Sequence, residues 1–380
     1  MLQRLKIITD TSAIKNNVRQ IKKRLKPSTR IMAIVKADGY GHGEKEAAES
    51  AFGEGVTDFG VATAEEAIFL REQTNIKNNA EILVLGARES GDQAKKCVRL
   101  GITQTVSDFA AAAKIAAAAK ELGVKAKIHI KIDTGMNRIG FPPNDGGIEG
   151  IVAASRFEEL EMTGIFSHFV ESQAADTSFS DGQALRFTDC VKKLKSAGIN
   201  LPLMHISNSA GVMLLPQYQF DMVRPGIILY GLPPSKNIGM EASGFLPALS
   251  VKSEVSFVKE IPEGMGVSYD RTFVTKRPSK IATIPIGYAD SYPRALSNKG
   301  YVLIHGKAVP IIGNICMDQM MADVTGIEDA APGDEVILIG KSEESGLKIS
   351  AELVAEWAGT ICYEIVCAMG NGRRSKKIVE

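Results

Sequence analysis

Eight short apolar runs alternate with helix-like segments between residues 31 and 235. Strands that are apolar along their whole length and joined through helices are typical of a parallel sheet covered on both faces. Eight such units in about 200 residues match the smallest closed (β/α)8 barrels. An open, doubly wound sheet is the alternative, but it usually has fewer strands, and no GxGxxG fingerprint follows the first run. The runs are IMAIV (31–35), DFGVAT (58–63), EILVLG (81–86), ITQTV (102–106), AKIHIKID (126–133), EMTGIFSHF (161–169), LPLMHIS (201–207) and GIILYG (226–231).

The pattern changes beyond the eighth run. Segments such as SVKSEVSFVKEI and YVLIHGKAVPIIG are β-rich, and no long helical pattern returns until SAELVAEWAG. We therefore predict an α/β plus β chain, with an N-terminal (β/α)8 barrel over residues 10–235 and a mainly β domain over 236–380. Residues 1–9 resemble a strand outside the barrel, which we expect to join the β domain. Within the barrel, Asp108 is expected to cap the alanine-rich helix DFAAAAKIAAAAKEL (108–122).

Composition narrows the class of function. The formal net charge is +1, so no basic excess favours a nucleic-acid or anionic-membrane partner. No apolar run approaches the roughly 20 residues that a membrane helix needs, and the first residues lack the pattern of a signal peptide. Five scattered cysteines form no CxxC pair and five histidines form no HExxH pair, so we expect neither a disulfide framework nor a metal site. These features predict a cytoplasmic globular protein.

Lys36 stands directly after the first apolar run and before the glycine-rich turn ADGYGHG. Functional side chains of a (β/α)8 barrel gather at the carboxyl ends of its strands. A lysine that is partly desolvated there has a lowered pKa, which makes its amine nucleophilic and suited to Schiff-base chemistry. The alternative is a lysine whose amine extends out of the core into water. Position alone leaves both readings open, so the other strand ends decide between them.

Further polar residues follow the later strand runs. Each has an ordinary structural explanation when taken alone: His168 is typical of a hydrogen-bonded core residue, and Ser209 would either cap a helix or bind an anion at its N-terminus. Their convergence with Lys36 on one rim of the barrel indicates an active site. These residues are Lys131, Asp133, Arg138, His168, His205, Asn208, Ser209 and Arg224.

Nine motifs occur in the order and spacing of one enzyme family: AIVKADGYGHG, KIDTGMNRIGF, SHF, HISNSAG, VRPGIILYG, GVSYDRT, IGYADSYPR, GNICMDQMM and TICYEI. On these motifs the sequence resembles the alanine racemases over nearly its whole length. The resemblance implies a pyridoxal 5'-phosphate enzyme with a (β/α)8 barrel and a β domain. Such an enzyme interconverts L-alanine and D-alanine, supplying D-alanine for peptidoglycan. The resemblance also implies a homodimer with shared active sites.

Two residues are similar to the family's bases on opposite faces of the cofactor. Lys36 resembles the lysine that forms an imine with the cofactor and then acts on one face. Tyr269 resembles the opposite-face base, which the second subunit supplies. A phenol is a poor base at neutral pH unless positive charge lowers its pKa, and the resemblance implies a link through His168 to Arg224. Arg224 also resembles the residue that faces the pyridine nitrogen, and Asp318 matches a supporting position.

The resemblance implies roles for further positions. Arg138 and the backbone amide of Met317 would hold the substrate carboxylate. Lys131 matches a position that is often carbamylated, where the carbamate orients Arg138, and Tyr288 and Arg294 match the substrate entryway. The implied cofactor-binding residues are Lys36, Tyr40, His168, Asn208, Ser209, Arg224, Gly226, Ile227 and Tyr363, and no metal is implied.

Three rival functions share parts of this pattern. A serine racemase of the same fold is disfavoured by Tyr363, because serine-preferring relatives tend to carry a smaller residue there. A decarboxylase that shares the fold places an acid near the pyridine nitrogen, where this chain has Arg224. A non-catalytic pyridoxal-phosphate carrier stops near the end of the barrel, whereas this chain continues to residue 380. An alanine racemase therefore remains the preferred prediction.

Overall fold

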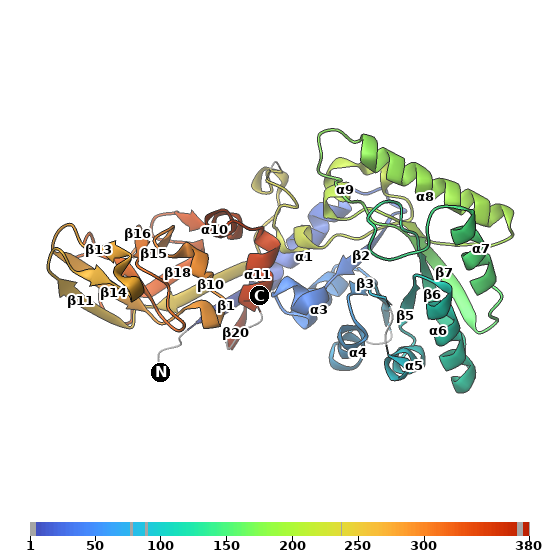
Figure 1. The fold of residues 1–380 in the computed structure, drawn as a ribbon, viewed down its shortest axis with the longest axis horizontal. Coiled ribbons are helices and arrows are strands. Elements are labelled where there is room, and N and C mark those ends of the chain that lie inside the picture. The colour runs from blue at the N-terminus through green and yellow to red at the C-terminus, as the bar shows by residue number, and fades with distance from the viewer. Residues whose placement is uncertain (1–4, 77–78, 88–89, 237, 371–374, 380) are drawn as a thin grey trace. The chain divides into compact units, whose positions relative to one another are not determined.

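The computed structural model describes residues 5–76, 79–87, 90–236, 238–370 and 375–379. The chain forms two compact units, both shown in Figure 1. The barrel unit comprises Ala13–Gly39 and Glu44–Leu246, and the β unit comprises Met1–Ser12, Tyr40–Gly43 and Pro247–Glu380. The β unit is therefore assembled from segments that are far apart in sequence, whereas the barrel unit is interrupted only by Tyr40–Gly43.

Eight parallel strands close the barrel in chain order, which confirms the predicted (β/α)8 architecture. Closure is made by the last strand pairing with the first, with Ile31 opposite Val223. Strands β3 and β5 are buried along their whole length, as expected for strands covered on both faces. The barrel strands are β2 (Arg30–Ile34), β3 (Asp58–Val61), β4 (Glu81–Val84), β5 (Thr103–Val106), β6 (Ala126–Lys131), β7 (Leu160–Phe166), β8 (Met204–His205) and β9 (Met222–Val223).

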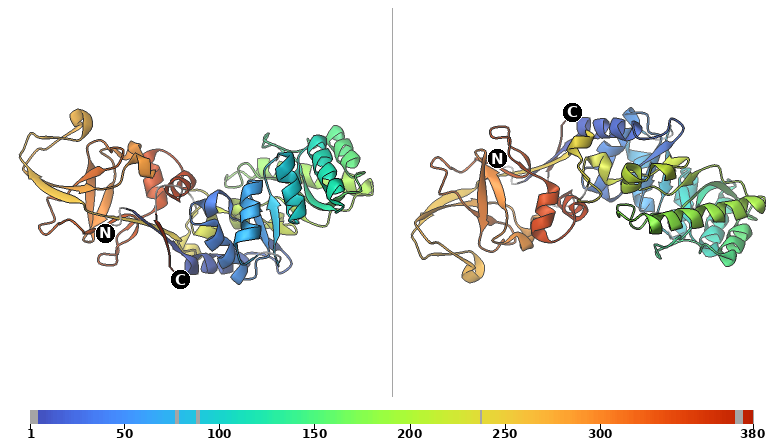
Figure 2. Two further views of the ribbon diagram at one scale, coloured as in Figure 1. Left: turned by 90° about the horizontal axis from the view of Figure 1, so that it is seen from below. Right: turned by 90° about the horizontal axis from the view of Figure 1, so that it is seen from above.

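Helices connect the barrel strands and lie outside them, as Figures 1 and 2 show. The predicted alanine-rich helix is α6, and Asp108 caps it as expected, since its Oδ1 accepts a hydrogen bond from the N–H of Ala111 at 2.8 Å. Gly123, in the left-handed region with φ 66°, ends this helix. The helices are α1 (Thr11–Lys22), α2 (Lys36–Tyr40), α3 (Glu44–Gly53), α4 (Ala64–Gln73), α5 (Gly91–Arg99), α6 (Phe109–Leu122), α7 (Asp145–Ala154), α8 (Ser178–Ser196) and α9 (Ser209–Leu214).

The eighth apolar run is not the eighth strand, so this detail of the prediction is wrong. The structure places β9 at Met222–Val223, and the run itself forms a 3-10 turn, η3 (Ile227–Tyr230). Pro225 has no N–H to donate to a strand ladder, which explains why the strand ends before it. The turn is buried all the same, and the Tyr230 hydroxyl donates to the carbonyl of Ile34 at 3.1 Å.

The β unit is built on a 10-stranded sheet in the order β11-β14-β17-β16-β15-β18-β10-β1-β20, with β19 paired to β18. β1 lies inside this sheet, antiparallel to β10 and parallel to β20. β12 and β13 form a separate two-stranded ribbon. The strands are β1 (Lys6–Asp10), β10 (Leu249–Glu254), β11 (Phe257–Ile261), β12 (Gly266–Val267), β13 (Phe273–Val274), β14 (Ser279–Ile284), β15 (Tyr301–Ile304), β16 (Lys307–Ile312), β17 (Met320–Asp323), β18 (Glu335–Lys341), β19 (Lys348–Ile349) and β20 (Ser375–Val379).

Two helices, α10 (Ala351–Ala358) and α11 (Cys362–Gly370), complete the β unit. Among the described residues, no single helix is long and apolar enough to cross a bilayer. In the same part of the chain, α10 and α11 are the one pair that together reach that length and composition, and they are bent by 104° at the break between them.

Candidate active site

Lys36 is half-buried and lies just beyond the carboxyl end of β2. The backbone after it turns through the left-handed region, with φ of 53° at Ala37, 53° at Asp38 and 60° at Gly39. Residues with a Cβ adopt this region rarely, and such positions cluster at functional sites. Glu66 in the first turn of α4 holds the turn, because its Oε1 accepts the N–H of Ala37 at 2.7 Å. The chain therefore turns away directly after Lys36 and leaves it at the end of the strand.

The carboxyl ends of the barrel strands carry most of the other predicted residues. All eight strands run in the same direction, so these ends share one rim. Lys131 ends β6, His168 follows β7, Asn208 and Ser209 follow β8, and Arg224, Gly226 and Ile227 follow β9.

Arg224 is buried, with 4% of its surface exposed, and its guanidinium lies within hydrogen-bonding distance of four acceptors. Its Nη1 donates to Nδ1 of His205 at 2.7 Å. Its Nη2 contacts the carbonyls of Ser167 and Ile206 at 2.6 and 3.1 Å, and Nδ1 of His168 at 3.1 Å. Since an arginine can only donate, both histidines must accept at Nδ1 and carry their hydrogen on Nε2. Arg224 thus determines the tautomer of each neighbouring histidine.

A second buried histidine extends this chain of hydrogen bonds. Nε2 of His205 lies 2.9 Å from Nδ1 of His129, and the tautomer set by Arg224 makes His205 the donor. Burial, and then the charge of Arg224, lowers the pKa of His205 well below its usual value and that of His129 to about 3. The sequence analysis missed His129 as a site residue. Side chains along a strand alternate between its two faces, so His129 and Lys131 lie on the same face of β6. This alternation was the signal that could have pointed to His129.

Lys131 is only 3% exposed, although it carries an amine. Its Nζ donates to the carbonyl of Ile132 at 2.8 Å and lies 5.3 Å from the ring centroid of Phe166. Burial, and then the charge of Arg224, lowers the pKa of Lys131 to about 7. Near neutral pH about half of this amine is therefore uncharged.

The loop after β6 is held by Asp133. Its Oδ1 accepts the N–H groups of Gly135 and Asn137, each at 3.0 Å, and its Oδ2 accepts that of Arg138 at 2.9 Å. Burial opposes the charged carboxylate, but these three bonds outweigh it and lower the pKa of Asp133. The backbone of the loop is thus fixed, while Arg138 itself is exposed and keeps its guanidinium available.

Two roles were expected for Ser209, and the first of them, capping α9, is wrong because Asn208 caps this helix. Asn208 has extended backbone, and its Oδ1 accepts the N–H of Gly211 at 2.9 Å. Oγ of Ser209 instead accepts the N–H of Gly226 at 2.9 Å. Ile227 begins η3, and the first N–H groups of such a turn have no partner within it. The Ser209 hydroxyl hydrogen and these N–H groups form a donor set of the kind that binds phosphate.

In the β unit, four predicted residues lie in or against the loop between β16 and β17. Met317 and Asp318 belong to this loop. Tyr269 begins the turn η5 (Tyr269–Arg271), and its backbone carbonyl accepts a hydrogen bond from the loop at 3.0 Å. Tyr288 begins the turn η6 (Tyr288–Asp290) and donates its backbone N–H to the loop at 3.1 Å. Arg294, in the turn η7 (Arg294–Leu296), belongs to the same unit.

Tyr40 and Tyr363 lie side by side in the β unit, with ring centroids 6.1 Å apart. Burial raises the pKa of the Tyr363 phenol, so this hydroxyl stays a hydrogen-bond donor. The turn after Tyr40 packs closely: a Cβ on Gly41, where φ is 81°, would lie 2.1 Å from the carbonyl oxygen of Val366. Only glycine fits this position.

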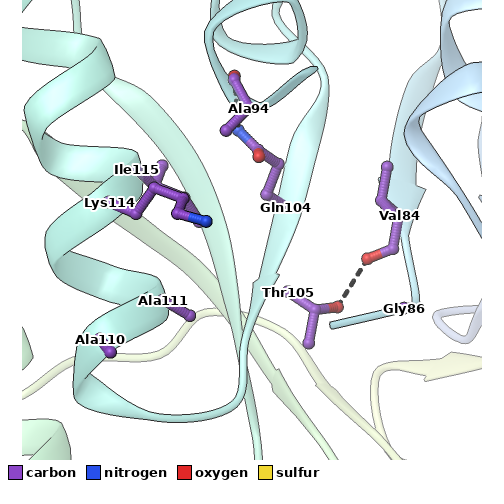
Figure 3. A pocket seen from close by; sticks show the side chains of 9 residues that line it. All are labelled: Val84, Gly86, Ala94, Gln104, Thr105, Ala110, Ala111, Lys114 and Ile115. Atoms are coloured by element: carbon purple, nitrogen blue, oxygen red, sulfur yellow. Dashed lines mark hydrogen bonds between the residues drawn. The ribbon is translucent and has the colours of Figure 1, made fainter. Parts of the chain in front are cut away.

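The barrel unit has a pocket of about 220 Å³ beside β4, β5 and α6 (Figure 3). None of the predicted site residues lines it. The Thr105 hydroxyl donates to the carbonyl of Val84 at 2.6 Å, and the Gln104 amide to that of Ala94 at 3.4 Å. These polar groups bond within the chain, and we assign no ligand to the pocket. In the described part of the chain, no three His, Cys, Asp or Glu residues gather as metal ligands.

The fold and the rim residues define a two-unit (β/α)8-barrel protein that gathers amine and guanidinium groups at the carboxyl ends of its strands. Residues 9–234 match the family model "Alanine racemase, N-terminal domain", and residues 248–378 match "Alanine racemase, C-terminal domain". The chain belongs to the alanine racemase family, as its motifs predicted.

Individual relatives match nearly the whole chain. It is similar to "Alanine racemase 2" of Caldanaerobacter subterraneus subsp. tengcongensis, with 42% identity over 373 residues, 98% of this chain and 94% of that protein. The solved alanine racemase of Clostridium difficile 630 has 35% identity and a TM-score of 0.92, covering 100% of this chain and 96% of that one. The solved alanine racemase of Bartonella henselae "with covalently bound pyridoxal phosphate" has 29% identity and a TM-score of 0.85, covering 99% of each chain.

Proposed function

We propose that this protein is an alanine racemase that interconverts L-alanine and D-alanine with pyridoxal 5'-phosphate as its cofactor. The observation that carries the proposal is the placement of Lys36 and buried Arg224 on one barrel rim, in a chain that matches both alanine racemase family models. A racemase must move a proton off one face of the α carbon and return one to the other. The residues therefore have to supply a cofactor site and two bases.

The rim residues fit the cofactor. When bound, pyridoxal phosphate supplies an aldehyde that condenses with a primary amine and an electron-poor ring that stabilises negative charge at the α carbon. Lys36 supplies the amine, and the Ser209 hydroxyl and the N–H of Ile227 supply hydrogen-bond donors for the phosphate. The N–H of Gly226 orients that hydroxyl by donating to its oxygen. Among the residues that the structure describes, none accepts a hydrogen bond from Nε of Arg224. This N–H can donate a hydrogen bond to an unprotonated ring nitrogen, and the guanidinium does not transfer its proton to that nitrogen.

The two bases are Lys36 on one face and Tyr269, supplied by a second copy of the chain, on the other. Tyr269 is 70% exposed on its own unit, which suits a group that acts in a neighbouring subunit. Burial lowers the pKa of Arg224 to about 9, so it remains a cation at neutral pH. His168 accepts from this cation at Nδ1 and carries its hydrogen on Nε2, from which it can donate to a phenolate. In this way the pair would place a hydrogen-bond donor beside the phenolic oxygen.

Substrate binding is assigned to Arg138 and to the backbone N–H of Met317, which would hold the alanine carboxylate. Lys131 is assigned as a carbamylation site, because only an uncharged amine adds to CO₂ and its pKa is about 7. The carbamate would place negative charge near Arg138, whose cation already lowers the pKa of Lys131. The remaining roles are Tyr40, Tyr363 and Asn208 at the cofactor, Asp318 in support, and Tyr288 and Arg294 at the entryway.

A homodimer follows from this assignment, since a single chain would lack half of its catalytic pair if Tyr269 acts in a neighbouring subunit. All five cysteines are free thiols, which suits the reducing cytoplasm in which the enzyme would make D-alanine for peptidoglycan.

The test is incubation of the cofactor-reconstituted protein with L-alanine in deuterated water, following α-deuteration and D-alanine together. We expect both, and no racemisation by Lys36→Ala. Two results together would refute the two-base assignment. The wild type would deuterate L-alanine without forming D-alanine, and Tyr269→Phe would deuterate it as fast as the wild type. Faster turnover of L-serine than of L-alanine would make the protein a serine racemase, and cofactor binding without either signal would make it a carrier.

A further inference from the structure

The backbone around Tyr269 is held in an unusual conformation. Three neighbouring residues with side chains have φ in the left-handed region: 64° at Ser268, 60° at Asp270 and 50° at Arg271. Such residues persist only where surrounding structure determines their conformation, and they mark sites where a group must be placed. The Tyr269 ring is largely exposed and gains little support from packing on its own unit. The backbone must therefore set the position of this ring.

One residue of the facing loop binds the start of the turn. Asn314 is 8% exposed, and its Nδ2 donates to the carbonyl of Tyr269 at 3.0 Å and to Oδ2 of Asp270 at 3.2 Å. Its own backbone carbonyl accepts the Ser268 hydroxyl at 2.5 Å. Asn314 thus contacts three consecutive residues, with the catalytic tyrosine in the middle.

The loop that carries Asn314 is itself fixed. A Cβ on Gly313, where φ is 73°, would lie 2.8 Å from Cβ of Ser268 and 2.8 Å from the carbonyl oxygen of Val267. The N–H of Gly313 donates to Oδ1 of Asn298 at 2.6 Å. The two backbones therefore lie in close contact, and neither can shift without the other.

We infer that Asn314 is a positioning residue, which holds Tyr269 where it can exchange a proton with the substrate; this rests on the role of Tyr269 in the proposed function. The side-chain amide is the active part, because one NH₂ group donates both to a carbonyl and to a carboxylate. Aspartate at this position would keep the shape but lose the donors, and it would face Asp270 with a like charge. The chemistry of the amide, rather than its volume, places the ring.

Two measurements on Asn314→Asp and Asn314→Ser test this role. The first is hydrogen–deuterium exchange of the peptide 266–272 in the cofactor-free protein, which we expect to rise in both variants. The second is the α-deuterium isotope effect on kcat for each alanine enantiomer in the holoenzyme. The same measurement on Tyr269→Phe identifies the enantiomer from which Tyr269 removes the α proton. For that enantiomer we expect the Asn314 variants to raise the isotope effect more than for the other. The value of kcat/KM should fall by about 10²-fold in both directions, because the two enantiomers have equal free energy.

Thr325→Val is the matched control. It removes hydrogen bonds to Asp323 and to the N–H of Lys280 in the same unit, but none in the turn around Tyr269. We expect it to leave both readouts at wild-type values. Unchanged exchange and isotope effects in Asn314→Asp would overturn the inference, as would isotope effects raised equally for both enantiomers. Racemisation by Tyr269→Phe at the wild-type rate would instead overturn the proposed role of Tyr269, and the inference with it.

Discussion

Replacing Lys131 by methionine should remove a pH dependence from the stability of the protein. Burial, followed by the charge of Arg224, lowers the pKa of Lys131 from 10.5 to about 7. Between these values the unfolded chain binds a proton at this amine that the folded chain does not, so stability rises with pH. Each pKa unit is worth about 1.4 kcal/mol. The free energy of unfolding should therefore rise by roughly 2 kcal/mol between about pH 7 and pH 9 because of this residue alone.

The assay is urea unfolding of the cofactor-free protein in CO₂-free buffers, followed by circular dichroism. The measured quantity is the free energy of unfolding of the wild type minus that of Lys131→Met. Lys127→Met is the control, because Lys127 lies on the same strand but pairs with Glu81 at the surface. We expect the difference to grow with pH for Lys131→Met and to stay flat for Lys127→Met. Parallel curves for the wild type and Lys131→Met would refute the assigned burial cost of the amine.

Adding bicarbonate to the same experiment tests the carbamylation of Lys131. A carbamate no longer titrates as an amine, so the pH dependence should shrink as bicarbonate is added. With ¹³C-bicarbonate, the folded wild type should show a carbamate carbon resonance that is absent from Lys131→Met. A resonance of equal intensity in both proteins would place the modification elsewhere.

Two further predictions concern packing. His205→Phe and His129→Phe should each destabilise the barrel. The double variant should lose about 1 to 3 kcal/mol less than the sum of the two single losses, because the hydrogen bond between the two histidines is lost only once. Additive losses of the free energy of unfolding in urea would contradict this bond. Gly41→Ala should lower stability by roughly 3 kcal/mol through its clash with the carbonyl of Val366, measured by the fluorescence of the single tryptophan on heating. Gly264→Ala, with a φ of 80° but open space around it, should cost clearly less.

The barrel could be predicted from the sequence because burial on both faces leaves a direct trace in composition. A strand covered by helices on one side and by the barrel interior on the other reads as an apolar run, and seven of the eight runs overlap a barrel strand. The run 226–231 shows the limit of this signal. It is buried like the others, but an apolar run reports burial and not backbone conformation, so the effect of Pro225 on the ladder was missed.

The candidate site could be predicted where a residue type is unusual for its position. It was less predictable where two adjacent residues could fill the same role. Lys36 is conspicuous because it directly follows an apolar strand, and the polar residues at the other strand ends favour a functional reading over an amine that extends into water. Asn208 and Ser209 are both good capping residues, and only the backbone shows which of them precedes the helix. His129 sits within an apolar strand, and its link to Arg224 through His205 depends on the barrel closing.

The position of β1 inside the sheet of the β unit imposes an order on folding during synthesis. A ribosome releases this strand first, but its neighbours β10 and β20 emerge only after the whole barrel unit has been made. The barrel can therefore close during translation, while the β unit waits for the last residues of the chain. A fragment that starts at residue 248 would lack the strand between β10 and β20 and expose two unpaired edges, which makes it prone to association.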